Sequence, residues 1–183
     1  MPRTSLTHPL MIAAVSAGPT YGRVGITFCP GQYDPHAQTG PWDRDLCCDL
    51  DAIRKWGAAA VVTLLRQEEF VLLRVEKLGR EVRRRDMSWY HLPITDVSIP
   101  DGEFDMNWKT AGHTLRKRLR GGQDILVHCR GGLGRAGTIG ARLLIELGMK
   151  PATAIEQIRA VRPGAIETPE QEHYVLGIRS CSA

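Results

Sequence analysis

The chain has 183 residues, of which 43% are hydrophobic and 24% charged, with a formal net charge of +4. This balance is typical of one soluble globular domain with its own core. No apolar run reaches the roughly 18 residues of a membrane span. Two basic runs, residues 80–86 and 116–120, fall at the ends of expected helices without interleaved aromatic residues, so we expect no nucleic-acid partner. Five cysteines give no even disulfide framework, and we expect reduced thiols and a cytoplasmic location.

An apolar stretch, PLMIAAVSAG, lies near the N-terminus at residues 9–18. It resembles the core of a short signal peptide, but His8-Pro9 interrupts it and Arg3 is its only basic flank. We therefore expect an N-terminal arm over residues 1–20 that is ordered or forms a first strand. No repeat, low-complexity tract or linker follows, which predicts a single domain over residues 1–183.

Strands and helices are expected to alternate from residue 22 onward. Short apolar runs predict strands at 22–28, 58–65, 87–94 and 124–128. Helical spacing, helix-starting prolines and helix-ending glycines predict helices within 43–57, 67–85, 101–122, 136–148 and 151–162, and a last helix from Thr168-Pro169. This alternation predicts an α/β fold with a mainly parallel central sheet of four to five strands flanked by helices.

Residues 125–140 read ILVHCRGGLGRAGTIG, and after a His-Cys pair four glycines (Gly131, Gly132, Gly134 and Gly137) surround two arginines. Residues 132–137 match the nucleotide-binding pattern G-x-G-x-x-G, but too little chain follows for a dinucleotide-binding fold. Cys129 and Arg135 instead form C-x5-R. A loop of this length can curl its backbone N–H groups around one phosphate, helped by the N-terminus of the following helix. The same field stabilises a thiolate, and the arginine can clamp two phosphate oxygens.

The spacing alone is weak, because Cys48 and Arg54 share it inside an expected helix that lacks glycine. Only Cys129 has the preceding strand, the glycines and the following helix. Sulfur transfer by a rhodanese-type loop is a poorer fit, because those loops are usually one residue shorter. The context of Cys129 therefore predicts a phosphate-binding loop with a nucleophilic thiolate.

The stretch HCRGGLGRAGT resembles the H-C-x5-R loop of cysteine-dependent protein phosphatases of the dual-specificity type. Its GGLGR form resembles the kinase-associated phosphatase branch, also called cyclin-dependent kinase inhibitor 3-like. GITFCPG, HLPITD and GAIETPEQ follow that branch in order and spacing, so the resemblance covers residues 20–178. It implies a protein-tyrosine-phosphatase-like fold and hydrolysis of phosphotyrosine and/or phosphoserine/threonine through a phosphocysteine intermediate. No cofactor or metal is implied, and the expected partner is a phosphoprotein, by analogy a protein kinase.

Catalytic roles are expected for three residues: Cys129 attacks phosphorus, Arg135 binds the phosphoryl group, and Asp96 protonates the leaving group. The remaining phosphate-binding positions are those of the loop, namely Arg130, Gly131, Gly132, Leu133 and Gly134. Asp96 is the acid that the resemblance implies, because it follows a strand upstream of the loop. Asp101 has another explanation, as the cap of the next helix.

Supporting roles are expected for His128 and Thr138. The resemblance implies that His128 holds the loop and tunes the thiol without transferring a proton. Many members carry Ser or Thr directly after the arginine, where the hydroxyl helps the thiolate leave. Here that position is Ala136 and the nearest hydroxyl is on Thr138, so we expect the intermediate to hydrolyse more slowly than it forms.

Glu167 and Gln171 are the last two candidates. Glu167 stands where related tyrosine phosphatases use a glutamine to position water. Gln171 is expected first to form a capping box with Thr168 and only second to position water. Two alternatives remain open: a weakly active phosphoprotein-binding scaffold, and a phosphatase of a non-protein phosphate such as a phosphoinositide. The second alternative depends on extra basic residues in the loop, and Arg130 leaves it open.

Overall fold

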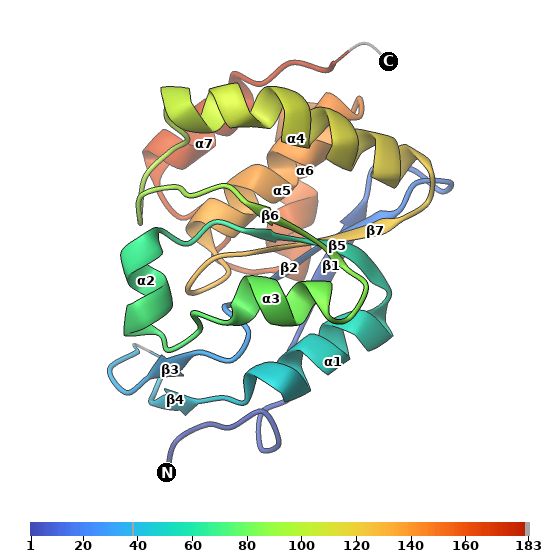
Figure 1. The fold of residues 1–183 in the computed structure, drawn as a ribbon. Helices are drawn as coiled ribbons and strands as arrows, with labels where there is room; N and C mark the ends of the chain where they lie inside the picture. The colour runs from blue at the N-terminus through green and yellow to red at the C-terminus, as the bar shows by residue number, and fades with distance from the viewer. Residues whose placement is uncertain (38, 182–183) are drawn as a thin grey trace.

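The computed structural model describes residues 1–37 and 39–181 and has a five-stranded sheet at its centre (Figure 1). The strands in spatial order are β1 (Ala13–Ser16), β2 (Arg23–Thr27), β7 (Asp124–His128), β5 (Ala58–Thr63) and β6 (Ser88–His91). β1 pairs with β2 antiparallel, and the other neighbours are parallel. The predicted mainly parallel sheet is confirmed, and the N-terminal apolar stretch supplies its first strand. A smaller antiparallel pair, β3 (Tyr33–Asp34) and β4 (Trp42–Asp43), lies apart from this sheet.

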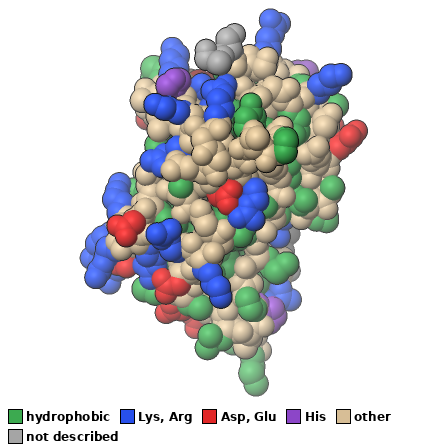
Figure 2. All heavy atoms as spheres, turned by 90° about the vertical axis from the view of Figure 1, so that its right-hand side faces the viewer, with side chains coloured by type: hydrophobic (Ala, Val, Ile, Leu, Met, Phe, Trp, Pro, Cys, Tyr) green, Lys and Arg blue, Asp and Glu red, His purple; other side chains and the backbone are tan. Residues whose placement is uncertain are grey.

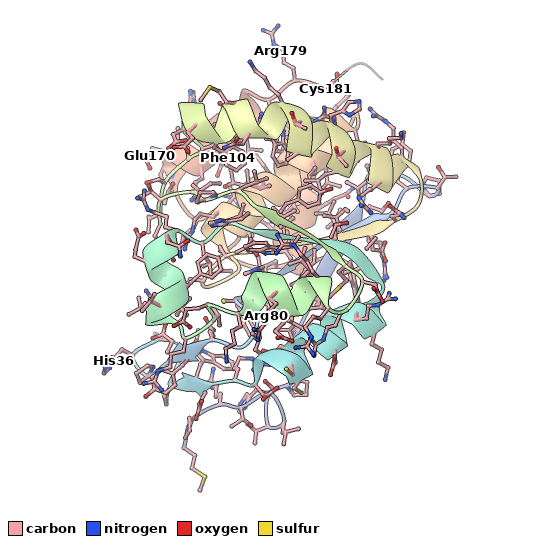
Figure 3. All side chains as sticks on the ribbon, in the orientation of Figure 1. His36, Arg80, Phe104, Glu170, Arg179 and Cys181 are labelled. Carbon is pink, nitrogen blue, oxygen red and sulfur yellow. The ribbon has the colours of Figure 1, made fainter. Side chains whose placement is uncertain are left out.

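Helices cover both faces of the sheet (Figure 1). One face carries α1 (Leu46–Trp56), α2 (Gln67–Leu72) and α3 (Leu78–Arg83); the other carries α4 (Gly102–Arg120), α5 (Gly134–Glu146), α6 (Pro151–Val161) and α7 (Pro169–Leu176). Side chains alternate along each strand, so Ile125 and Val127 of β7 join one core and Leu126 joins the other. Figure 3 shows Phe104 pointing from α4 toward the sheet, where it is buried. Burial on both faces explains why the strands read as unbroken apolar runs.

The single helix expected over residues 67–85 is wrong, because the chain forms α2 and α3 instead. α2 ends where Arg74 takes a left-handed conformation with φ 58°. The Val75 N–H donates to the Phe70 carbonyl at 2.8 Å and the Arg74 N–H to the Val71 carbonyl at 3.2 Å. These two bonds are the Schellman pattern that closes a helix. The break lets Leu73 and Val75 both reach the core.

The other predicted helices are confirmed to within a few residues at their ends, and α5 begins at Gly134, two residues earlier than expected. Arg135 is therefore in the first turn of α5. Within residues 1–37 and 39–181, every helix is too short or too polar to span a membrane. Figure 2 shows one face of the molecule, on which Lys and Arg side chains are spread over several parts with Asp and Glu among them.

Candidate active site

The candidate loop lies at the carboxyl edge of the parallel strands, where ligands commonly bind in open α/β sheets. It runs from Cys129, directly after β7, to Gly134 at the start of α5. The Cys129 side chain is buried, and the Gly132 N–H donates to its Sγ at 3.2 Å. A thiolate at this position faces a backbone donor at the N-terminus of a 13-residue helix. The arrangement stabilises negative charge on sulfur.

Two neighbouring glycines of the loop differ in whether a residue with a side chain could replace them. Gly132 has φ 66°, and a Cβ there would lie 2.4 Å from the Phe28 nitrogen, because the loop packs against the end of β2. At Gly131, a Cβ would meet no heavy atom of the described residues within 4 Å. Gly132 is therefore required by both conformation and close backbone approach, whereas Gly131 leaves room for a side chain.

We expect Gly132→Ala to lower the free energy of unfolding by more than about 2 kcal/mol, because a left-handed alanine is strained and its Cβ would collide with the backbone. Gly131→Ala is the matched control and should change it by less than about 0.5 kcal/mol. Urea unfolding of both variants measures the difference. Equal losses would contradict the distinct roles inferred for the two glycines.

Arg135 is buried and held from two sides. Its Nη1 and Nη2 donate to the two carboxylate oxygens of Glu69 at 2.6 and 2.8 Å, and its Nη2 lies 2.9 Å from Asp96 Oδ1. Burial lowers the pKa of Arg135, but the Glu69 hydrogen bond and the nearby Cys129 outweigh it, so the pKa stays above its ordinary value. The guanidinium is thus a fixed cation. Glu69 could not be singled out from the sequence, because an acidic residue in a first helical turn already suits the helix dipole.

Asp96, the residue expected to be the acid, lies beside Arg135, and its side chain is 56% exposed. The next residue, Val97, has φ 59°, which is rare for a β-branched residue. Its N–H donates to Asp96 Oδ1 at 3.1 Å. Asp101 instead accepts from the Phe104 N–H at 2.8 Å at the start of α4, which confirms its expected capping role. A strained turn therefore places the Asp96 carboxylate beside Arg135, whereas the Asp101 carboxylate caps α4.

His128 is fully buried beneath the loop. The pairing of β5 with β7 sets Thr63 opposite His128, and their Oγ1 and Nε2 atoms are 2.8 Å apart. The Trp89 indole N–H donates to the same hydroxyl at 2.8 Å, which leaves the hydroxyl hydrogen free to donate to Nε2. Burial lowers the pKa of His128 to about 3. The imidazole is therefore neutral near pH 7.

The three other supporting candidates lie around the start of α5. The Thr138 hydroxyl donates to the Gly134 carbonyl at 2.8 Å, one turn back along the helix. Gln171 forms the predicted capping box with Thr168, and its side-chain amide also donates to the Ser98 carbonyl at 3.1 Å in the Asp96 loop. A Cβ at Gly134 would lie 2.9 Å from side-chain atoms of both Glu167 and Gln171, so both flank the loop.

Two further arginines, one within the loop and one outside it, make different contacts. Arg130, expected as a phosphate contact, donates through Nε and Nη2 to Asp34 Oδ2 at 3.0 and 2.7 Å. Arg162, which the sequence analysis missed, donates to the Gly132 and Gly131 carbonyls, both at 3.0 Å. Arg162 therefore orients these two loop carbonyls toward its own guanidinium group. In the sequence, Arg162 is a basic residue at the end of a helix. Such residues are common, so its contact with the loop could not be predicted.

Comparisons with known proteins identify the family of this chain. The family model described as "Swiss Army Knife protein, DSP-PTPase phosphatase domain" matches residues 48–175. Cyclin-dependent kinase inhibitor 3 of Rattus norvegicus is 30% identical over 139 residues, which make up 74% of this chain and 64% of that protein. Protein tyrosine phosphatase type IVA 3 of Bos taurus is 32% identical over 132 residues, or 71% of this chain and 70% of that protein.

A solved structure is also similar over most of its length. It is kinase associated phosphatase with serine in place of its catalytic-site cysteine, and it covers 92% of this chain and 93% of its own, with 25% identity and a TM-score of 0.78. The similarity confirms the expected protein-tyrosine-phosphatase-like fold. Together with the rat relative, it confirms the predicted resemblance to the kinase-associated phosphatase branch.

Proposed function

Because this chain belongs to the family of DSP-PTPase phosphatase domains, we propose that it hydrolyses phosphoproteins through a phosphocysteine intermediate. The observation that carries the proposal is the grouping at the carboxyl edge of the sheet. Cys129 Sγ accepts from a loop N–H, and the same loop leads into a fixed Arg135 that contacts Asp96. Nucleophile, phosphate-binding cation and acid are thereby within one site.

In the first proposed step, the Cys129 thiolate attacks phosphorus, an S–P bond forms, and the bond to the leaving oxygen breaks. Asp96 donates its proton to that oxygen. Before this transfer, two phosphoryl oxygens take the place of the Asp96 carboxylate on Arg135, and the freed carboxylate takes up a proton from solvent and faces the leaving group. The bidentate contact from Glu69 keeps the guanidinium plane in place during this exchange.

In the second proposed step, water attacks the phosphocysteine, Asp96 takes a proton from it, and the S–P bond breaks to release phosphate and the thiolate. Gln171 and Glu167 lie at the start of α5, where side-chain oxygens can orient this water. The Gln171 amide also donates to the Ser98 carbonyl in the Asp96 loop. Gln171 therefore connects the place proposed for the attacking water with the segment that holds the acid.

A phosphoprotein substrate is supported by the relatives. The rat relative is named a cyclin-dependent kinase inhibitor and the solved structure a kinase associated phosphatase. The partner we propose is therefore a phosphoprotein, with a protein kinase as the first candidate. The chain spans 64% of the rat protein's length, so what that protein binds comes to this chain only as a proposal.

The proposed function is tested by hydrolysis of an aryl phosphate and of phosphotyrosine, phosphoserine and phosphothreonine peptides with a metal chelator present. We expect turnover of the aryl phosphate and of at least one peptide class, because the proposed mechanism uses only protein groups. Peptide binding without release of phosphate from any substrate would favour a scaffold and overturn the proposal.

The alanine at position 136 leads to a kinetic prediction. It is fully buried directly after Arg135, and the Thr138 hydroxyl is bonded to the Gly134 carbonyl. With no hydroxyl at residue 136 to donate a hydrogen bond to the departing thiolate, the second step should be slower than the first, so rapid-quench experiments should show a burst close to one leaving group per enzyme. Ala136→Ser should raise the steady-state rate several-fold and shrink the burst. A linear time course for the unsubstituted protein would contradict this expectation.

A further inference from the structure

The side chain of Arg130 forms a salt bridge with a residue outside the phosphate-binding loop. Arg130 directly follows Cys129, yet two of its nitrogens donate to Oδ2 of Asp34 on β3. The Arg130 side chain is 36% exposed and that of Asp34 only 7%. A cation next to the proposed nucleophile is therefore held by an almost buried anion.

The carboxylate of Asp34 is itself fixed. Its second oxygen, Oδ1, accepts from the His36 N–H at 3.3 Å, so the turn after β3 holds it in place. Figure 3 shows His36 at the outer end of this segment. β3 is held in turn by backbone pairing with β4 and by the bond from the Tyr33 N–H to the Leu73 carbonyl at 2.9 Å. Arg130 thus bonds to a rigid partner, and the ion pair has no net charge.

We propose that Asp34 determines specificity at this site by holding Arg130 away from a second phosphate group, which favours singly phosphorylated ligands. This inference rests on the proposed function for the identity of the first phosphate site. A second phosphate next to the reacting one needs a free cation at the loop. Arg130 belongs to the loop itself, whereas Arg162 is bonded to the Gly132 and Gly131 carbonyls. While the ion pair lasts, such a ligand must displace a charge-assisted, two-bond contact. Asp34 acts through Arg130 and is a positioning residue.

The test measures binding to full-length proteins in which Cys129→Ser removes the proposed nucleophile. The first pair of ligands is a peptide with one phosphoserine and the same peptide with two adjacent phosphoserines. The second pair is inositol 1-phosphate and inositol 1,4-bisphosphate, which represents a lipid headgroup. For each pair, calorimetry gives a preference ratio, the Kd of the singly phosphorylated ligand divided by that of the doubly phosphorylated one.

We expect Asp34→Asn to raise the preference ratio about tenfold for at least one pair, which is the effect of one charge-assisted hydrogen bond. The pair that responds identifies the source of the second phosphate. Adding Arg130→Gln to Asp34→Asn should abolish the rise, because the freed guanidinium is its cause. Asp43→Asn is the matched control: it removes the same charge from an exposed position on β4 and should leave the ratio within about twofold.

The double variant also tests the inference against the parent protein, because the pair is neutral in both, and its ratio should lie within about twofold of the parent's. A fall would mean that Arg130 already binds the second phosphate, and would overturn the inference. So would an unchanged ratio in Asp34→Asn, a rise that persists without Arg130, or no binding of any phosphorylated ligand. Absence of hydrolysis by the protein with Cys129 intact would instead overturn the proposed function and leave these ratios unaffected.

Discussion

Cys129→Ser should lower the hydrolysis of an aryl phosphate by at least about 10⁴-fold, because a serine hydroxyl at this position remains protonated and is a poor nucleophile. Cys129 Sγ accepts from the Gly132 N–H at 3.2 Å and faces the N-terminus of α5, two donors of the kind that favour a thiolate. A neutral hydroxyl of similar size leaves these donors in place, so the variant should still bind inorganic phosphate. Steady-state kinetics and calorimetry measure the two properties separately.

Cys48→Ser is the matched control for this result. Cys48 and Arg54 have the same C-x5-R spacing, but both lie in α1, where the backbone N–H groups are used within the helix. We expect the hydrolysis rate of Cys48→Ser to stay within about twofold of the unsubstituted protein. Comparable losses in both variants would mean that the effect of serine arises from folding and not from a nucleophile in the loop.

Asp96→Asn should lower kcat by about a hundredfold or more on a substrate with a poor leaving group, because an amide cannot donate a proton to the departing oxygen. The loss should be much smaller for p-nitrophenyl phosphate, whose leaving group needs little protonation. Asp96 contacts Arg135 at 2.9 Å and is 56% exposed, so asparagine fits there without burying an unsatisfied group. The dependence of kcat on the leaving group, measured over a series of aryl phosphates, is the readout.

The variant Asp101→Asn tests whether Asp101 acts as the proton donor or only as a helix cap. Asp101 accepts from the Phe104 N–H at the start of α4, and asparagine can cap a helix nearly as well. This variant should show the leaving-group dependence of the unsubstituted protein. A steep leaving-group dependence in Asp101→Asn, together with a flat one in Asp96→Asn, would transfer the acid role to Asp101.

The fold and the loop could be predicted because their signals are local. The strands of the parallel sheet are buried on both faces, so they read as short apolar runs between turn residues. The glycines after Cys129 mark a turn between a strand and a helix, and Gly132 has the left-handed conformation that such a turn needs. Distinguishing Cys129 from Cys48 required only this local context.

The break between α2 and α3 could not be predicted from local signals. Helices commonly end at a left-handed glycine, but here Arg74 takes that conformation. Its neighbours Leu73 and Val75 are both fully buried, so packing against the core stabilises the break. The surrounding sequence, rich in Glu, Leu, Lys and Arg, favours a continuous helix. Tertiary packing therefore outweighed helix propensity.

The polar contacts of the site could not be predicted for a different reason, because the two residues of each contact lie far apart along the chain. Glu69 and Arg135 are 66 residues apart, and Asp34 and Arg130 are 96 residues apart. No periodicity or spacing joins such residues, and each has an ordinary explanation in its own segment. The sheet topology brings them together, because α2 and β3 both lie beside the carboxyl edge where the loop emerges (Figure 1).

The measurement that tests the central claim most directly is acid quenching of the protein during turnover of an aryl phosphate, followed by proteolysis and mass spectrometry. The account predicts one phosphoryl group on the peptide that contains Cys129, attached to sulfur, and its accumulation during the burst. The same peptide from Cys129→Ser should carry none. Full turnover with no phosphorylated peptide, or with phosphate on another residue, would contradict the phosphocysteine mechanism.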